Sequence, residues 1–507
     1  MPDARPDATG YETVIGLEIH VQLRTRGKVF APAPYLYGGA LPDDAAPQDI
    51  APNTLIDPVV LALPGALPVL NTAALEQAIR FGLLVNATIP GHSNWDRKNY
   101  YYPDSPKNYQ LTQKDHPVTQ GGEVEIELPG PARNIMGEHK TIRLNHAHLE
   151  EDVGKLTHTG ATSQVDYNRA GAPLLEIVTE PDLRTPDEAV ALLHSLRHLL
   201  NTAGISDCDM EKGQMRCDAN VSVRPTGQRH LNTRTEMKNL NSISGVKNAI
   251  EYEARRQIRE IQAGRPIPQE TRGWNAETAR TYSLRGKEDA HDYRYFPDPD
   301  LMPVKIDNAT TARLRATLPE RPYDRQRRYM SAPQDGGYAL PYTLTSVLVA
   351  NLPLCAYLET AIATHPRNPQ GVANLIANDF LGALAAANAT FDPARIPPAH
   401  LGTLVRHADA GTLSKQQARE VFQEMFTTGK SPDTIIEEKG LSQSNDTGEI
   451  EKIILEILAQ PTSAKPITEY KAGNEKALNS LKGPIMKASR GKANPRIVDE
   501  IIRRLLA

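Results

Sequence analysis

Cysteine is scarce in this chain of 507 residues, which has three, at positions 208, 217 and 355, and no Cys-x-x-Cys pair. So few cysteines make neither a disulfide framework nor a cysteine-based structural zinc site. The chain also lacks an apolar run of about 18 residues, which excludes a membrane-spanning helix. Residues 1–10 lack the cationic-then-apolar pattern of a signal peptide, so we expect a disordered N-terminal stretch on a cytoplasmic protein.

Neither sign of charge dominates, because 57 Lys and Arg residues stand against 61 Asp and Glu residues. This balance excludes a polybasic nucleic-acid coat and an acidic disordered tail. The chain also lacks the usual sequence motifs of phosphate loops, dinucleotide folds, zinc proteases and serine hydrolases. The missing motifs are Gly-x-x-x-x-Gly-Lys-Ser/Thr, Gly-x-Gly-x-x-Gly, His-Glu-x-x-His and Gly-x-Ser-x-Gly.

What the sequence does contain is a set of segments that are polar on one side only. Residues 12–23, 215–224 and 233–239 alternate apolar and polar side chains with a period of two, which predicts half-buried strands. Glu18 and His20 share the polar face of the first strand, about 7 Å apart. Such strands form a sheet that buries its apolar side and leaves a charged side for solvent or substrate.

Helices are predicted over residues 71–86, 186–203 and 244–263, and helix follows helix from about residue 306. Because the strands cluster rather than alternate with helices, we expect an α+β fold with an antiparallel-sheet cradle domain. An all-helical domain and a small helical tail domain follow it. The expected boundaries are 11–305 for the cradle, 306–400 for the helical domain and 401–507 for the tail.

Acidic residues gather in one short segment, where Glu150, Glu151 and Asp152 follow a strand-like stretch. Together with Glu18, His20 and Asp218, these acids would make an oxygen-rich pocket for Mg²⁺, which prefers carboxylates and water and bridges substrate phosphates. A solvated acidic turn and an exposed strand face explain the same residues, since charge runs usually face solvent. The residues alone leave both interpretations open.

Two further features have both a binding and a structural interpretation. Three tyrosines at positions 100–102 follow the basic pair Arg97 and Lys98. This combination suits nucleic-acid binding, although ordinary strand or loop packing is the favoured explanation. Residues 461–507 carry 10 basic and 4 acidic residues. That surplus suits a phosphate-binding surface, and a solvated helical face explains it nearly as well.

Several long runs of the sequence are specific enough to be compared with a known family. They are ETVIGLEIHVQL (12–23), LPGALPVLN (63–71), DRKNYYYPD (96–104), LEEDVGK (149–155), DYNRAGAPLLEIVTEPD (166–182), MRCDANVSV (215–223), EMKNLNS (236–242), ETRGW (270–274) and DAHDYRYFPDPD (289–300). Together they resemble the B subunit of the aspartyl/glutamyl-tRNA(Asn/Gln) amidotransferase, the GatB/GatE family. Residues 401–507 resemble the small helical tail that ends the proteins of this family, so the resemblance covers almost the whole chain.

The resemblance implies ATP-dependent amidation of misacylated Asp-tRNA(Asn) or Glu-tRNA(Gln). A carboxylate is a poor acyl electrophile at neutral pH, so the B subunit would phosphorylate it before ammonia displaces the phosphate. The chain has no amidase Ser-Ser-Lys signature, so ammonia must come from elsewhere. The resemblance implies that its source is a partner amidase, the A subunit, in a heterotrimer with a small C subunit. Misacylated tRNA and a non-discriminating aminoacyl-tRNA synthetase are the other expected partners, and no membrane is involved.

The site residues follow from the resemblance, motif by motif. It implies ATP and Mg²⁺ as cofactors, with Glu18, His20, Glu151 and Asp218 as the metal ligands. Glu151 is the strongest single candidate and is also assigned a catalytic role, and Glu150 and Glu211 are supporting candidates.

Three further residues are assigned to the substrates. Lys98 would hold a phosphate or the substrate carboxylate, and Lys98 and Arg216 would contact ATP. Glu176 would orient ammonia or accept its proton. In a strand, Leu174 and Val178 would share the face of Glu176.

One departure from the family concerns zinc. Some members carry cysteine pairs shortly after the first strand, whereas residues 28–33 here read KVFAPA. We therefore expect no zinc there, and loop packing in its place.

Two other functions remain open, a non-catalytic tRNA-binding scaffold and a stand-alone ligase for a small carboxylic acid. Acidic residues on the sheet face argue against the scaffold, because acids repel RNA unless a metal intervenes. The locally basic helical tail favours a macromolecular substrate over a small acid. The sequence does not determine which misacylated tRNA is used.

Overall fold

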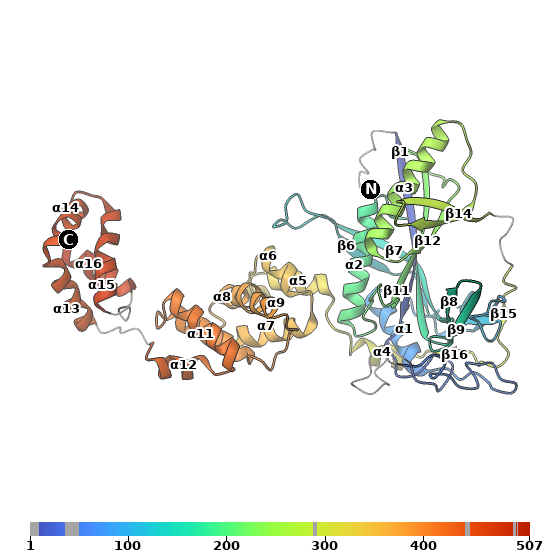
Figure 1. Ribbon diagram of the computed structural model, residues 1–507, viewed down its shortest axis with the longest axis horizontal. Helices are drawn as coiled ribbons and strands as arrows, with labels where there is room; N and C mark the ends of the chain where they lie inside the picture. Colours follow the sequence, from blue (N-terminus) through green and yellow to red (C-terminus); the bar gives the residue numbers. More distant parts are fainter. Residues whose placement is uncertain are drawn as a thin grey trace. The chain divides into compact units, whose positions relative to one another are not determined.

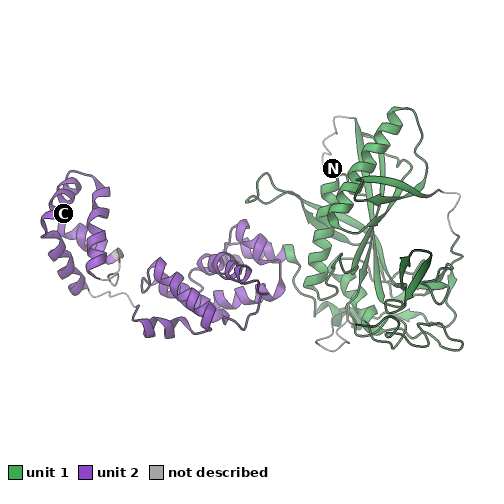
Figure 2. Cartoon of the chain, in the orientation of Figure 1, with its two compact units in different colours: residues 1–323 green, residues 324–507 purple. Residues whose placement is uncertain are grey.

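The computed structural model describes residues 10–35, 50–286, 292–441, 447–489, 493 and 495–506. The chain divides into two compact units, residues 1–323 and 324–507 (Figure 2). Of the N-terminal stretch predicted to be disordered, residues 1–9 lie outside the described residues. Each unit is described by itself below.

The first unit contains all the named strands and four helices that lie wholly within it. The strands are β1 (Tyr11–Gln22), β2 (His92–Ser93), β3 (Asp96–Asn99), β4 (Tyr109–Thr112), β5 (Thr119–Gln120), β6 (Glu123–Glu127), β7 (His139–Glu151), β8 (Lys155–Thr159), β9 (Thr162–Asp166), β10 (Pro173–Thr179), β11 (Met215–Pro225), β12 (Thr235–Leu240), β13 (Glu270–Asn275), β14 (Arg280–Gly286), β15 (Phe296–Pro297) and β16 (Val304–Lys305). The helices are α1 (Thr72–Leu84), α2 (Pro186–Thr202), α3 (Ile243–Gln262) and α4 (Asn308–Arg315).

One large sheet dominates this unit, with the strand order β14-β13-β12-β11-β1-β10-β7-β5 and β6 beside β7 (Figure 1). Its strands pair antiparallel except β12 and β13, which run parallel. The connection between those two contains α3, as a parallel pair requires a long crossover. The predicted α+β fold with a mainly antiparallel sheet is confirmed.

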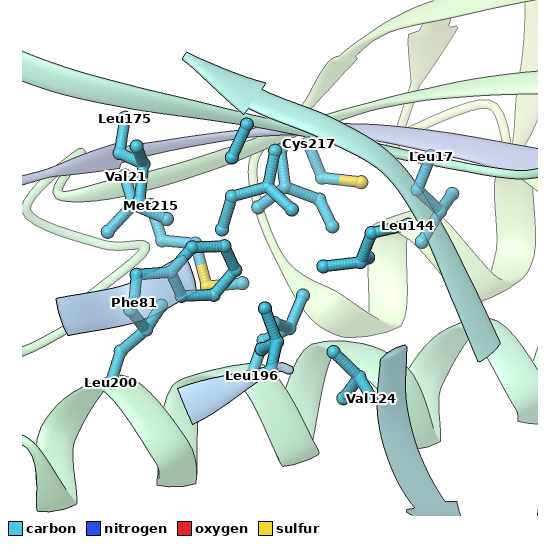
Figure 3. Packing of buried hydrophobic residues seen from close by; sticks show 14 of the residues in the cluster. Leu17, Val21, Phe81, Val124, Leu144, Leu175, Leu196, Leu200, Met215 and Cys217 are labelled. Atoms are coloured by element: carbon cyan, nitrogen blue, oxygen red, sulfur yellow. The ribbon is translucent and has the colours of Figure 1, made fainter. Parts of the chain in front are cut away.

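The apolar side of the sheet carries the core. Along β1 every second residue from Ile15 to Val21 is at most 1% exposed. Figure 3 shows Phe81 of α1 and Leu196 and Leu200 of α2 packed against sheet residues such as Leu17 and Val21. Because side chains alternate between the two faces, this core fixes Glu18 and His20 on the opposite, polar face. The predicted period-two pattern is therefore confirmed.

The helix signals in the sequence also hold. Thr185 caps α2 by accepting a hydrogen bond from the backbone N–H of Glu188, and Asn71 caps α1 in the same way through Ala73. The helix α3 starts after Ser242, which accepts from the backbone N–H of Gly245. These caps place the helix starts within a residue or so of the predicted positions.

The segment of residues 28–33, where we expect loop packing, is filled by ordinary side chains. Val29 and Phe30 are buried, and the Phe30 ring meets the edge of Trp95 at a centroid distance of 4.9 Å. Lys28 is fully buried and donates hydrogen bonds from its Nζ to the carbonyl oxygens of Ala170, at 2.6 Å, and Tyr167, at 3.4 Å. Residues 28–30 are therefore held by packing and hydrogen bonds within the loop, as expected.

The second unit is helical throughout its described residues. Its helices are α6 (Tyr342–Leu348), α7 (Leu352–Thr364), α8 (Pro369–Asn374), a π-helical segment (Leu375–Phe380), α9 (Leu381–Ala386), α10 (Pro398–Asp409), α11 (Lys415–Thr428), α12 (Pro432–Lys439), α13 (Thr447–Leu458), α14 (Ala464–Lys471), α15 (Leu478–Ala488) and α16 (Pro495–Leu506), and α5 (Pro322–Met330) begins at the division of the units. Short 3₁₀ turns occur at Pro333–Asp335, Pro461–Ser463 and Glu475–Ala477.

Two hydrophobic clusters stabilise the helical unit. One extends from Tyr329 to Ile436 and the other from Ile450 to Leu506. The expected boundary at 400/401 falls inside α10, whose Leu401 belongs to the first cluster.

The division between the two compact units also lies later in the chain than the expected change at 305/306. The reason is that Ile306 and Leu314 join the core of the first unit, where α4 packs against α1.

None of the described helices is both long and apolar enough to cross a membrane.

Candidate active site

A cavity of about 1120 Å³ lies on the polar face of the large sheet. Polar side chains from β1, β7 and β11 line one part of it, and residues of β3 and the segment 292–296 line another. The lining includes six of the seven charged or titratable residues of the candidate site: Glu18, His20, Lys98, Glu150, Arg216 and Asp218. Glu176, the seventh, contacts this group from β10.

Strand register brings the acids and histidines together. On β1, His20 lies opposite Glu176 of β10, and Glu176 in turn lies opposite His148 of β7. The Nδ1 atom of His20 is 3.2 Å from an oxygen of Glu150 and 3.8 Å from an oxygen of Glu176, and its Nε2 is 3.4 Å from Glu18. Three strands thus contribute to one compact cluster.

Burial and charge shift the pKa values of this cluster in different directions. Burial disfavours the imidazolium of His20, but hydrogen bonds to Glu150 and Glu18 outweigh it and raise its pKa to about 10. Burial also opposes ionisation of Glu150, yet His20 and Lys98 lower its pKa to about 2. For Glu176, burial followed by the charge of Glu150 raises the pKa to about 8. Burial lowers the pKa of His148 to about 4.

Two overlapping sets of donor atoms in this cluster have the spacing of a cation site. Glu18, His20 and Glu176 form one, and His148, Glu150 and Glu176 form the other, each with its ligand atoms within 4.8 Å of one another. Both Oε2 of Glu150 and Nδ1 of His148 are buried without a hydrogen-bond partner among the described residues. Carboxylates with an imidazole are a donor set that a hard divalent cation accepts.

Lys98 supplies a cation to the same cavity. No carboxylate among the described residues comes within ion-pair distance of its Nζ, which lies 5.1 Å from the centre of the Tyr293 ring. Burial disfavours its charge, but Glu150 and Tyr295 outweigh this and raise the pKa of Lys98 above its ordinary value. The side chain therefore stays charged and available to an anion.

Arg216 and Asp218 reach the cavity from neighbouring positions on β11, and both are paired. Arg216 donates to Asp152 at 2.7 Å, while its Nε is buried and has no partner among the described residues. Asp218 accepts from Lys238 of β12 at 2.6 Å. Asp218 is therefore held by a lysine rather than by the cluster around His20.

Glu151 is not brought to the cavity. It follows Leu149 on the opposite face of β7, where its carboxylate pairs with Lys107 and accepts a hydrogen bond from the backbone N–H of Leu111 at 2.9 Å. The alternation that places Glu150 in the cluster turns Glu151 away from it. Glu211 also lies elsewhere, exposed in the turn before β11, where its N–H donates to Asp209.

Three residues of the site were missed or ranked low. His148 was not singled out, although it alternates with Ala147 and Leu149 and so belongs to the polar face of β7. Glu150 was ranked below Glu151, although the same alternation distinguishes them. Lys238, which pairs with Asp218, was placed on a charged face but was not assigned to the site.

The tyrosines after β3 are not packed into the core. Tyr101 is 82% exposed and Tyr102 53% exposed, and both line the cavity. The favoured loop-packing explanation therefore does not describe these two rings, which stay open at the cavity wall.

Comparison with known proteins places this geometry in a family. Residues 13–312 match the model of the GatB/GatE catalytic domain, and residues 356–506 match that of the GatB domain. The aspartyl/glutamyl-tRNA(Asn/Gln) amidotransferase B subunit of Opitutus terrae is 52% identical over 98% of this chain and 99% of its own length. The proteins of the same name from Cupriavidus pinatubonensis and Carboxydothermus hydrogenoformans are 46% and 44% identical, with the same coverage. The chain therefore belongs to the GatB/GatE family.

Proposed function

We propose that this chain is the B subunit of a glutamine-dependent amidotransferase that converts Asp-tRNA(Asn), Glu-tRNA(Gln) or both to the amide with ATP. A carboxylate oxygen of the aminoacyl group attacks the γ-phosphorus, the bond to the bridging oxygen breaks, and ADP leaves. Ammonia then attacks the carbonyl carbon, phosphate departs with the electrons of the C–O bond, and the nitrogen loses a proton. The observation that carries this proposal is the cavity in which clustered acids face a lysine that has no carboxylate partner among the described residues.

Mg²⁺ is the cation we assign to the acidic cluster, with Glu18, His20 and Glu176 as its protein ligands once His20 and Glu176 have released their protons. When bound, this cation would offset the negative charge of the transferred phosphoryl group. Glu150 holds the His20 imidazole through its Nδ1 and so orients the other ring nitrogen. Asp218 supports the site from β11 through its pair with Lys238.

We assign the binding of the phosphates and of the substrate carboxylate to the basic residues of the cavity. Lys98, which no carboxylate in the described part of the chain neutralises, holds an anion at its Nζ. Arg216 donates one hydrogen bond to Asp152, and its buried Nε–H, which has no partner among the described residues, is a second donor. Both residues keep the anionic groups of ATP and the aminoacyl end together, which lowers the entropic cost of the reaction.

Two roles are open to Glu176, and an experiment separates them. As a cation ligand it is needed for phosphoryl transfer, and as the acceptor of the ammonia proton it is needed only after that step. Its place in both donor sets favours the ligand role. Its pKa near 8, raised by burial, fits a group that takes up a proton near neutral pH.

Ammonia must come from a partner, which we assign as the amidase, or A subunit, with a small C subunit completing a cytoplasmic heterotrimer. A non-discriminating aminoacyl-tRNA synthetase would supply the misacylated tRNA. We assign the grip on the tRNA body to the helical tail, predicted over residues 401–507. Its exposed Lys471, Lys476 and Lys487 form no ion pair with a described residue, whereas Arg503 and Arg504 pair with acids.

The test is ADP release by the purified heterotrimer, with and without misacylated tRNA. Glu150→Gln should abolish ADP release that depends on charged tRNA while glutamine hydrolysis continues, because the carboxylate that orients His20 is lost. Glu123→Gln, an exposed acid on β6 away from the cavity, is the matched control and should behave as wild type. Normal amide formation by the Glu150 variant would contradict the assignment and favour the scaffold function.

A further inference from the structure

The cavity has an aromatic wall as well as an acidic one. Tyr101, Tyr102 and Phe296, which is 44% exposed, line it together with Tyr100 and Tyr293. Neither the ring of Tyr101 nor that of Tyr102 makes a ring contact or hydrogen bond with a described residue. Exposing such rings to water is unfavourable by about 25 cal/mol per Å² of apolar surface, so a flat partner that covers them gains free energy.

The backbone of this wall is held in place. The N–H of Tyr100 donates to the carbonyl of Asn108 at 3.2 Å, and the N–H of Ser105 donates to that of Tyr102 at 3.0 Å. At the end of β3, Asn99 fixes the adjacent segment 292–296 by donating its backbone N–H to the carbonyl of Tyr293 at 3.0 Å and its side-chain amide to that of Arg294 at 2.8 Å. Both sides of the wall are therefore preorganised, which reduces the ordering cost of binding.

Charge near the wall indicates what the flat partner carries. The ammonium group of Lys98 lies over the ring of Tyr293, and Arg294 lines the same cavity. Cations beside open aromatic faces suit a base that is attached to phosphates. The cavity of about 1120 Å³ exceeds the usual 300–1,000 Å³ of a small-molecule pocket, so it has room for a nucleotide and an aminoacyl end together.

We propose that Tyr101 and Tyr102 form a stacking platform for an adenine base, delivered either by ATP or by the 3′-terminal adenosine that carries the aminoacyl group of the tRNA. The inference rests on the proposed function, because both sources are substrates of that reaction. The phosphates or the aminoacyl carboxylate then lie toward Lys98 and the cation assigned to the acidic cluster, while the base lies on the tyrosines. The tyrosines bind and position the substrate and take no part in bond making.

The experiment uses the complete heterotrimer with three variants. Tyr101→Ala/Tyr102→Ala removes both rings, and Tyr101→Phe/Tyr102→Phe keeps the rings but removes the hydroxyl groups. Met302→Ala removes a side chain that is 81% exposed, much as Tyr101 is, but does not line the cavity, and serves as the control. Thermal unfolding midpoints check that each variant folds.

Two measurements distinguish the sources of the base. One is the KM for ATP at saturating misacylated tRNA, and the other is inhibition by uncharged tRNA that ends in CCA or in CC. If ATP is the source, the alanine pair raises the KM for ATP by roughly 5- to 150-fold, the range that stacking of one base supplies. If the tRNA is the source, wild type prefers the CCA end by a similar factor and the alanine pair loses that preference.

The phenylalanine pair should keep the wild-type values in either case, because stacking needs only the rings. Unchanged values in the alanine pair would overturn the platform, and loss in the phenylalanine pair as well would overturn stacking as its cause. A wild-type heterotrimer that forms no amide from ATP, glutamine and misacylated tRNA would instead refute the proposed function. The two failures are therefore separate results.

Discussion

The burial and charge of Lys28 predict how the stability of the protein changes with pH. Its side chain is fully buried, and among the described residues its Nζ has only the carbonyl oxygens of Ala170 and Tyr167 as hydrogen-bond partners. Burial lowers the pKa of Lys28 from 10.5 to about 8, against the opposing attraction of Asp57 and Glu151. At neutral pH the folded protein therefore carries a buried charge that destabilises it, by about 3 kcal/mol if the whole shift acts on folding.

The direction of the pH effect follows from this lowered pKa. Above pH 8 the folded state has released the proton from Lys28, whereas the unfolded chain keeps it up to about pH 10.5, so the unfolded state binds more protons in this window. Stability then rises with pH. For these two pKa values the gain between pH 7 and pH 9.5 is about 2 kcal/mol of unfolding free energy.

Lys28→Met keeps the length of the side chain and removes the charge, so it isolates this effect. Urea titrations give the unfolding free energies of wild type and variant. The difference between these two values should change by about 2 kcal/mol between pH 7 and pH 9.5. Lys155→Met, at an exposed position on β8, should show no such change. A difference between wild type and the Lys28→Met variant that stays constant across this range would refute the reasoning.

Three further predictions concern the site, the tail and the metal content. Glu176→Gln should abolish ADP release if Glu176 is a cation ligand; ADP release that continues while amide formation stops would make it the proton acceptor instead, as rapid-quench assays can show. Removal of residues 442–507 should raise the KM for charged tRNA and leave glutamine hydrolysis intact, and unchanged tRNA kinetics would contradict the tail assignment. Elemental analysis of the purified chain should find no tightly bound zinc. One equivalent of zinc would contradict the expectation that loop packing replaces a zinc site at residues 28–33.

Local patterns predicted the elements of the fold well, because they depend on neighbours in the sequence. The alternation in residues 12–23 fixed the two faces of β1, and the cap at Thr185 fixed the start of α2. What depends on distant contacts was not predictable. The parallel pairing of β12 with β13 and the inclusion of α4 in the first unit arise from packing between segments far apart in the chain.

The candidate site shows the same limit at the level of single residues. Glu18 and His20 were predicted to be neighbours because both lie on one strand, whereas the contacts of His20 with Glu150 and Glu176 depend on the register of three strands. Register is set by which side chains the sheet buries together, and no local signal states it. The local pattern also could not show whether Glu176 faces the site, because Leu174 and Val178, two apolar residues, share its face of β10.

The neighbouring acids of β7 show what a local pattern can still decide. Ala147 and Leu149 are apolar and fully buried, so the next residue of their face, Glu151, had to point toward the protein interior and find a partner there. It finds Lys107. Glu150 alternates with these residues and faces the cavity, where one of its oxygens is buried without a hydrogen-bond partner among the described residues. A buried, ionised carboxylate oxygen without a partner is unfavourable in the free protein, so a cation or donor that reaches it gains binding free energy. That gain is the physical reason to assign the binding of a charged ligand to this face of the sheet.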